Sequence, residues 1–309
     1  MLRLPWPGLF KTIRTTKNWY SVLLLAFMLG RDCIARFRDG NTFVIERGQR
    51  PNYSIIRAML DDNMRGSGPK VRILIDTEYG QVLDLGGYKF VIAPQFSFLP
   101  LYLIFFQHWL PDEDLSGFDV IDIGAYTGDT AIYFASKGAR VYAYEPVPEA
   151  FSMMRRNIAL NGLKTTVLIY NSALNEDSTS TMLVDTDTYE GSTSLVEMQD
   201  SLPKGTEIHV DSITLKNALA RCDPASRKLL KLNCEGCEFG VISSPNGELL
   251  RKFDEILCFY HSLLAGIPKA QLITVLEENG FEVVANDKRS LIIAHKLEAQ
   301  VNAGRPKSV

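Results

Sequence analysis

The sequence predicts an α/β fold with a mostly parallel seven-stranded sheet, helices on both of its faces, and a small α+β region before it. Three observations support this prediction. From residue 118 onward, short apolar runs alternate with amphipathic stretches, which is the pattern of β–α–β units. The first apolar run leads into an acidic residue and two glycines, where a buried strand turns into a helix. The last two apolar runs lie close together, as in a closing antiparallel pair.

The seven strands are expected where the apolar runs occur, at residues 120–123, 140–144, 166–170, 229–232, 256–260, 281–285 and 291–295. Glycines after amphipathic stretches mark helix ends. Helices are therefore expected at residues 129–137, 148–161, 212–220 and 268–279. Residues 179–210 are rich in Thr, Ser and Asp and interrupt the alternation, so we expect a hairpin or a substrate-side loop there.

The chain divides into four segments. Residues 1–34 are predicted to be a helical segment, 35–110 a small β-rich lead-in, 111–299 the main α/β domain, and 300–309 a disordered tail. Turn signals in the lead-in separate candidate strands at 42–45, 71–75 and 88–92, with a loop expected at 61–70.

The first 31 residues carry five basic residues and no acidic one, with aromatic residues between them. Their apolar run, residues 21–30, is too short to span a bilayer. It is followed by Arg31 and Asp32 and not by a small-residue cleavage site, which argues against a secretory signal. We expect an amphipathic helix that packs on the main domain, and a helix lying on a membrane surface is the alternative.

The composition is that of an ordinary globular protein. A net charge of −3 gives no basic excess, so no nucleic-acid partner is expected. The five cysteines are an odd number in a chain too long to need disulfides, which favours a reducing, cytoplasmic setting. Cys234 and Cys237 have the spacing of metal ligands but no second pair, so we expect small core residues there and no metal.

Residues 120–128 read Val-Ile-Asp-Ile-Gly-Ala-Tyr-Thr-Gly. Gly124 and Gly128 allow the backbone to approach a ligand closely, and the following helix offers free N–H groups to a carboxylate or phosphate. A dinucleotide site starting at Gly124 needs glycine at positions 126 and 129, where this chain has Tyr126 and Asp129. This spacing argues against NAD. An Asp followed by Gly two and six positions later is the methyltransferase form of the loop.

An acidic residue also ends the second strand. Glu145 lies 21 positions after Gly124, where its carboxylate can accept hydrogen bonds from two ribose hydroxyls. Such an acid is common to NAD and methyl-donor sites, so by itself it does not choose between them. Together with the glycine loop it predicts a nucleoside site.

In this loop and in several later blocks that occur in the same order, the chain resembles the FkbM family of methyltransferases. They are residues 120–128, Tyr-Glu-Pro-Val-Pro at 144–148, Asn-Ile-Ala-Leu-Asn at 157–161, Asp-Ser-Ile-Thr-Leu at 211–215, Lys-Leu-Asn-Cys-Glu-Gly-Cys-Glu at 231–238, and the strand that ends at His261 followed by residues 272–281. The resemblance extends over residues 118–296. The family usually has Asn where this chain has Tyr126, and Asp where it has Asn233.

The resemblance implies the class I methyltransferase fold, which is Rossmann-like, with S-adenosylmethionine as cofactor. It also implies methyl transfer to oxygen, on a hydroxyl of a small-molecule, sugar, lipid or secondary-metabolite acceptor. The implied cofactor-binding residues are Asp122, Gly124, Ala125, Tyr126, Thr127 and Gly128 for the methionine portion, Glu145 for the ribose, Ser172 and Ala173 for the adenine, and Asn233 at the end of the fourth strand.

A hydroxyl acceptor must lose a proton, and the ends of the fourth and fifth strands are expected to open onto the same cleft. Glu235 and His261 are the candidate catalytic residues there. The alternative is that Glu235 caps the next helix and His261 has a structural role. Two other functions stay open, namely a non-catalytic or membrane-surface binding protein that retains the fold, and an NAD-dependent oxidoreductase. The sequence predicts neither the acceptor nor the oligomeric state.

Overall fold

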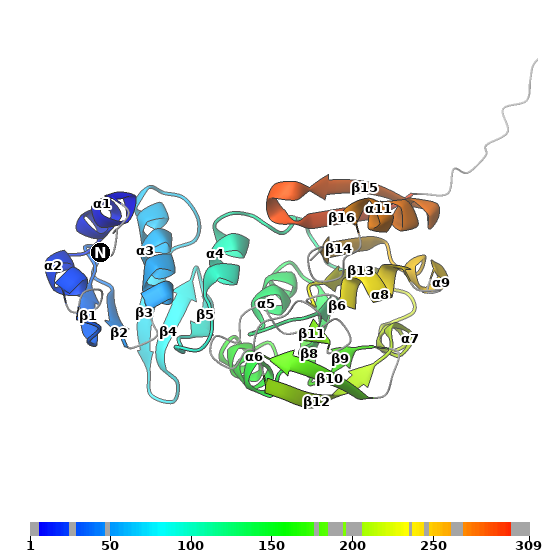
Figure 1. Ribbon diagram of the computed structural model, residues 1–309, viewed down its shortest axis with the longest axis horizontal. Coiled ribbons are helices and arrows are strands. Elements are labelled where there is room, and N and C mark those ends of the chain that lie inside the picture. Colours follow the sequence, from blue (N-terminus) through cyan, green and yellow to red (C-terminus); the bar gives the residue numbers. More distant parts are fainter. Residues whose placement is uncertain are drawn as a thin grey trace, which may run out of the picture.

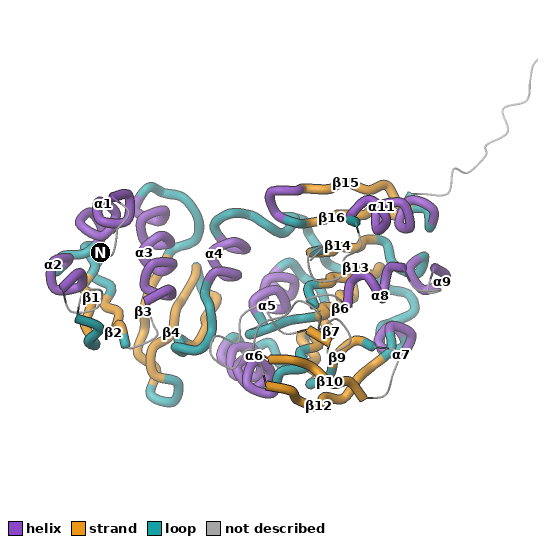
Figure 2. The backbone as a smooth tube through the Cα atoms, viewed as in Figure 1, coloured by secondary structure: helices purple, strands orange, loops and turns teal. Residues whose placement is uncertain are grey.

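The computed structural model describes residues 6–24, 29–46, 50–175, 179–184, 194–195, 206–234, 237–243, 247–260 and 268–297. These residues form an N-terminal region and a main α/β domain, which lie side by side (Figures 1 and 2). Within them, no helix is long and apolar enough to cross a membrane. The tail predicted at 300–309 lies outside the described residues.

The main domain contains the seven-stranded sheet that the sequence predicts, with strand order β15-β16-β14-β13-β6-β7-β8. Five of the strands, β13, β14, β6, β7 and β8, are mutually parallel, and β16 runs antiparallel to its neighbours β14 and β15. The bounds are β6 Phe118–Ile123, β7 Arg140–Tyr144, β8 Val167–Tyr170, β13 Arg227–Leu232, β14 Glu255–Phe259, β15 Phe281–Asn286 and β16 Leu291–Lys296. The predicted fold class is therefore confirmed.

Two apolar cores cover the two faces of this sheet, because successive residues of a strand point to opposite faces. Along β6, Val120 belongs to one core and Ile121 to the other. Helices α5 (Asp129–Ser136) and α6 (Pro148–Leu160) contribute to the first core. Helices α7 (Leu215–Leu219), α8 (Cys237–Ser243), α9 (Gly247–Leu250) and α11 (Lys269–Glu278) contribute to the second.

The insertion after the third strand contains the predicted hairpin. Strands β10 (Thr179–Val184) and β12 (Thr206–Ile213) pair antiparallel, between β11 (Ser194–Leu195) and β9 (Ala173–Leu174). Because β12 extends to Ile213, helix α7 starts later than the sequence pattern predicts. Its first turn is capped by Thr214, whose hydroxyl accepts a hydrogen bond from the Asn217 N–H at 3.1 Å.

Among the described residues, the N-terminal region contains the predicted strands, two helices within the predicted helical segment 1–34, and two further helices. The first helix was expected to pack on the main domain, but it packs on the third helix of the N-terminal region. Its strands are β1 (Cys33–Arg36), β2 (Thr42–Ile45), β3 (Val71–Asp76), β4 (Gly80–Leu85) and β5 (Tyr88–Val91), and its helices are α1 (Trp6–Thr15), α2 (Trp19–Ser21), α3 (Arg50–Met64) and α4 (Leu99–Phe105). Helix α3 occupies part of the segment predicted as a loop at 61–70. It forms because Tyr53, Ile56, Met59 and Leu60 recur at helical spacing and are all buried.

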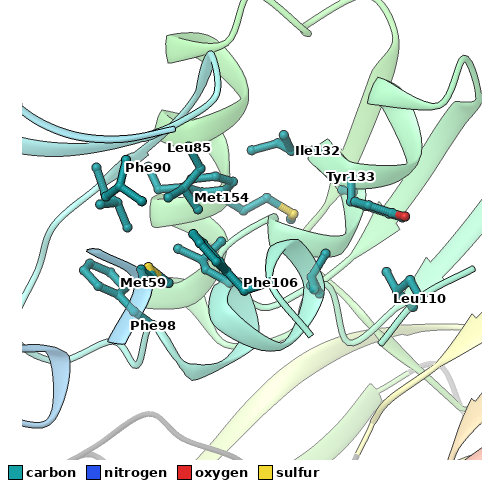
Figure 3. Close-up of a cluster of buried hydrophobic side chains, with 14 of the residues drawn as sticks. Met59, Leu85, Phe90, Phe98, Phe106, Leu110, Ile132, Tyr133 and Met154 are labelled. Atoms are coloured by element: carbon teal, nitrogen blue, oxygen red, sulfur yellow. The ribbon is translucent and has the colours of Figure 1, made fainter. Parts of the chain in front are cut away.

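The first core continues from the main domain into the N-terminal region. Figure 3 shows Leu85, Phe90 and Phe106 of that region close to Ile132 of α5 and Met154 of α6. The N-terminal region therefore packs against the two helices that follow the first and second strands of the sheet. This packing places the segment between β5 and α4 beside the loop that leaves β6.

Candidate functional site

The loop from β6 to α5 is fixed by backbone hydrogen bonds to the neighbouring strand. The N–H groups of Gly124 and Ala125 both donate to the carbonyl of Tyr144 at 3.0 Å. The Gly128 N–H donates to the Ala125 carbonyl at 2.8 Å, which closes the turn before the helix. The loop thus forms at the carboxyl ends of β6 and β7, where ligands bind in open α/β sheets.

Both glycines have positive φ angles, +72° at Gly124 and +87° at Gly128. A β-carbon at position 124 would lie 1.9 Å from the carbonyl oxygen of Asn233, and one at position 128 would lie 3.0 Å from Cγ of Met154. The sequence analysis attributed these glycines to close approach of a ligand. Contacts within the protein already require them, since the loop packs directly on the end of β13 and on α6.

Beneath the loop lies a buried ion pair. The ammonium of Lys231 on β13 lies 2.9 Å from Oδ1 of Asp122, which is its register partner on β6. The same ammonium donates to the carbonyls of Gly124 at 2.8 Å and Ile123 at 3.2 Å. Thr130 donates its hydroxyl hydrogen to the other oxygen of Asp122 at 2.6 Å. Asp122, predicted to bind cofactor, therefore anchors the loop from below.

Asp129, the first residue of α5, is a second buried acid at the loop. It is 4% exposed, and its Oδ1 has no hydrogen-bond partner among the described residues. Burial raises the pKa of Asp129 to about 7, against the opposing effect of the nearby Lys231 charge. A carboxylate with an unpaired buried oxygen beside a ligand loop is suited to bind a cationic group.

Glu145 holds the middle of the loop, at Tyr126, by a hydrogen bond. Its Oε2 accepts a hydrogen bond from the Tyr126 N–H at 2.9 Å, and its Oε1 accepts one from the Val147 N–H at 2.9 Å. Burial raises the pKa of Glu145 to about 7, although both backbone hydrogen bonds act to lower it. Each carboxylate oxygen can accept a second hydrogen bond, so Glu145 can still accept hydrogen bonds from the hydroxyl groups of a ligand.

A sequence model of the methyltransferase FkbM domain matches residues 122–283. The match starts at Asp122, near the end of β6, and contains the loop, Glu145 and strands β7 and β13. It spans more than half of the chain. The chain belongs to the FkbM methyltransferase family. No curated protein matches the chain.

Solved structures that match this methyltransferase include several other methyltransferases. The FkbM methyltransferase from Methylobacillus flagellatus KT is 14% identical, with 63% of this chain and 48% of that chain covered and a TM-score of 0.39. A putative rRNA-methylase from Clostridium thermocellum is 12% identical, with 60% and 89% covered and a TM-score of 0.38. The METTL16 methyltransferase domain is 13% identical, with 86% and 87% covered and a TM-score of 0.41.

Tyr126, where the family usually has Asn, takes a left-handed backbone conformation with φ of +49°. Asn adopts this conformation more readily than Tyr does, so other contacts hold the Tyr126 backbone. The Tyr126 hydroxyl accepts a hydrogen bond from the Ser97 N–H at 3.0 Å, and its ring packs edge-on against Phe96. In this methyltransferase the loop is thus attached to the N-terminal region.

The end of β13 departs from the sequence prediction. Cys234 and Cys237 form a disulfide, with their Cα atoms 5.5 Å apart, and so are not merely small core residues. The Asn233 N–H donates to the Ile123 carbonyl at 3.1 Å, so Asn233 lies beside the loop as predicted. Glu235 and His261, the candidate catalytic pair, lie outside the described residues.

The residues predicted for the adenine lie at the end of β8. Ser172 lines a cavity of about 640 Å³, together with Ile169, Tyr170, Asn171, Asp211, Ser212, Ile213, Asn217 and Arg221. Ala173 is buried in β9, where it pairs with Ser212. The side-chain amide of Asn171 donates to the carbonyl of Glu145 at 2.8 Å. This hydrogen bond connects the cavity to the end of β7, where Glu145 lies.

Two residues of this site were absent from the predicted cofactor-binding set. Lys231 lies among the leucines of the buried half of β13, and a buried cation needs an acidic partner, so the sequence could have indicated its role. In the sequence, Asp129 was informative only as a residue that breaks the dinucleotide glycine spacing. Within the described residues, no group of three or more His, Cys, Asp or Glu is arranged to hold a metal ion. The expectation of no metal stays a prediction.

Proposed function

We propose that this FkbM methyltransferase binds S-adenosylmethionine at the β6–α5 loop and transfers the methyl group to a hydroxyl oxygen. The acceptor class is a sugar, a lipid or a secondary metabolite. The family match supports methyl transfer, and the buried acids around the loop support the choice of cofactor. The single observation that carries the proposal is the unpaired buried oxygen of Asp129 beside that loop.

The residues present fit this cofactor. S-adenosylmethionine has an ammonium group, a carboxylate, a ribose and an adenine. Asp129 would hold the ammonium, and backbone N–H groups in the first turn of α5 would hold the carboxylate. Glu145 would accept hydrogen bonds from the ribose hydroxyls through its remaining lone pairs, and Ser172 would contact the adenine.

When bound, the cofactor supplies an electrophilic methyl group on a positively charged sulfur. Transfer forms a bond from the acceptor oxygen to the methyl carbon while the carbon–sulfur bond breaks and its electron pair goes to sulfur. The chain must align the acceptor with that bond, exclude water, and accept the hydroxyl proton. Glu235 and His261 are the proposed proton acceptors, and a His261→Gln variant that keeps its full transfer rate between about pH 6 and pH 8 would remove His261 from this role.

Isothermal titration with S-adenosylmethionine tests the cofactor site. We expect wild-type protein to bind and the Asp129→Asn and Glu145→Gln variants to bind at least about tenfold more weakly, the loss for one charged hydrogen bond. Glu255→Gln is the control, because Glu255 is a buried carboxylate on β14 with a raised pKa and lies outside the loop. Equal affinity for all four proteins would exclude the proposed site.

A second experiment tests the oxygen acceptor. Protein supplied with methyl-labelled cofactor and extracted glycans or lipids is expected to give a product whose label resists mild alkali, because a methyl ether on a hydroxyl is not hydrolysed. Release of the label as methanol would show a carboxylate acceptor instead. Cofactor binding without label transfer to any fraction would favour the non-catalytic alternative.

The proposed setting is cytoplasmic, and no nucleic-acid partner is proposed, as the composition suggests. The disulfide between Cys234 and Cys237 argues against this location, because disulfides are rare in cytosolic proteins. The NAD alternative has no supporting observation, since Asp129 at the start of α5 would repel a pyrophosphate.

A further inference from the structure

The N-terminal end of the molecule exposes an unusual share of large apolar side chains. Among the described residues, ten such side chains are exposed, and five of them fall between positions 10 and 34. They are Phe10 at 64%, Tyr20 at 63%, Leu24 at 49%, Leu29 at 55% and Ile34 at 46% exposure. Single exposed apolar residues are normal, but a concentration of them in one segment marks an interaction surface.

Hydrogen bonds place the segments that carry four of these side chains next to one another. The amide of Asn18 donates to the carbonyl of Ile34 at 2.7 Å, which fastens the start of α2 to β1. Tyr20 and Leu24 are four positions apart on the helical segment that follows, and so share a face. The Leu29 N–H donates to the Leu24 carbonyl at 2.9 Å. We name Tyr20, Leu24, Leu29 and Ile34 the apolar end patch.

Basic residues accompany this patch. Residues 10–24 contain Lys11, Arg14 and Lys17 and no acidic residue, whereas the whole chain has a net charge of −3. Arg14 forms an ion pair with Asp61 of α3, so the local excess of positive charge rests on Lys11 and Lys17. Over residues 29–46, three arginines and three acidic residues balance. The Lys17 N–H donates to the Arg36 carbonyl at 2.7 Å, so these two exposed basic residues lie on neighbouring segments beside the patch. The local charge is therefore positive on a negatively charged protein.

The patch lies far from the main sheet. In Figure 1 α1, α2, β1 and β2 form one end of the molecule, while β13 to β16 lie at the other. Since no described helix can span a bilayer, contact with lipid would be confined to the surface of the membrane. Exposed aromatic and aliphatic side chains with adjacent cations are the composition of an interfacial anchor.

We propose that the apolar end patch, with Lys17 and Arg36, is a docking surface for an anionic lipid bilayer. This proposal is independent of methyl transfer, because it concerns residues outside the cofactor site. It would place the enzyme at a membrane and would favour a lipid or a membrane-borne glycan among the proposed acceptors. The alternative occupant of this patch is a second copy of the chain, and sedimentation distinguishes a dimer from a membrane-bound protein.

Vesicle flotation of the full-length protein tests the proposal. We expect the protein to float with vesicles of phosphatidylcholine and phosphatidylglycerol, and to stay in the dense fraction with phosphatidylcholine alone. Because basic residues near an anionic surface strengthen membrane binding, the Lys17→Glu/Arg36→Glu variant should lose roughly tenfold or more in membrane partitioning. The Tyr20→Ser/Leu24→Ser/Ile34→Ser variant should lose a similar factor through its reduced apolar area.

Matched controls come from elsewhere on the surface. Ile75→Ser changes a side chain that is 77% exposed on β3, and Lys252→Glu reverses an exposed charge in the main domain. Both should float like wild type, and circular dichroism should show all variants folded. No flotation of the wild type, equal flotation on neutral vesicles, or unchanged flotation of both patch variants would overturn the proposal. So would a dimer that both patch variants convert to a monomer in sedimentation, without flotation of the wild type.

Discussion

The ammonium of Lys231 lies 2.9 Å from a carboxylate oxygen of Asp122, and the two side chains are 1% and 0% exposed. They face each other on adjacent parallel strands, directly under the β6–α5 loop. Because Lys231 also donates to the carbonyls of Ile123 and Gly124, one side chain holds both the acid and the turn. The positive charge therefore acts as a fixed support for the loop.

Removal of this support should be costly. The Lys231→Met variant leaves the Asp122 carboxylate buried without its partner, which typically costs about 3–5 kcal/mol. Urea unfolding measures this loss, and the Lys231→Met/Asp122→Asn variant should recover a large part of it because no buried charge remains. A loss below about 1 kcal/mol, the value for an exposed ion pair, would contradict the structural role.

The Gly124→Ala substitution separates backbone strain from steric contact. A left-handed φ costs alanine about 1–2 kcal/mol. At Gly124 the new β-carbon would also meet the Asn233 carbonyl, which adds about 1–3 kcal/mol of overpacking. Gly162→Ala is the matched control, because Gly162 has φ of +69° and no neighbouring atom within 4 Å of its β-carbon position. Equal losses of stability in the two variants would show that the contact with β13 does not matter.

The sheet could be predicted from the sequence because its central strands β6, β7, β13 and β14 are buried on both faces. The six residues of β6 are all buried, and four of them are apolar, with Asp119 and Asp122 as the exceptions. A run this rich in apolar residues can be recognised without knowing what packs against it. Helix ends at Gly138, Gly162 and Gly280 were equally readable, since each glycine has a positive φ that ends a helix. Local signals of this kind do not depend on the rest of the fold.

What the sequence did not predict depends on contacts between distant segments. Gly124 is required by Asn233, and Tyr126 reaches the Ser97 N–H, but neither pair is visible along the chain. Helix α3 is an exception, because the helical spacing of Tyr53, Ile56, Met59 and Leu60 is visible in the sequence and could have predicted it. The pairing of Cys234 with Cys237 depends on the turn after β13.

That pairing predicts a thiol count. Alkylation of the denatured, unreduced protein should label three cysteines, Cys33, Cys222 and Cys258, and alkylation after reduction should label five. The Cys237→Ser variant is the control, because it releases Cys234 and should give four labels without reduction. Mass spectrometry reads the count directly. Five labels on unreduced wild-type protein would show that the pair is a dithiol under those conditions.

The raised pKa of Asp129 predicts a pH dependence of stability. Burial raises the pKa of this carboxyl to about 7, so the folded protein holds a proton there that the unfolded chain releases near pH 4. A raised carboxyl pKa favours the folded state at low pH, and this contribution is lost as the pH rises from about 4 to about 7.

The Asp129→Asn variant has no charge to bury at this position. Its free energy of unfolding relative to wild type should therefore increase between about pH 5 and pH 7, by at most about 1.4 kcal/mol per pH unit, and level off above. Glu145, whose pKa is also raised to about 7, contributes equally to both proteins and cancels in this difference. Urea unfolding at a series of pH values measures it, and a difference that is constant across this range would mean that Asp129 is ionised throughout.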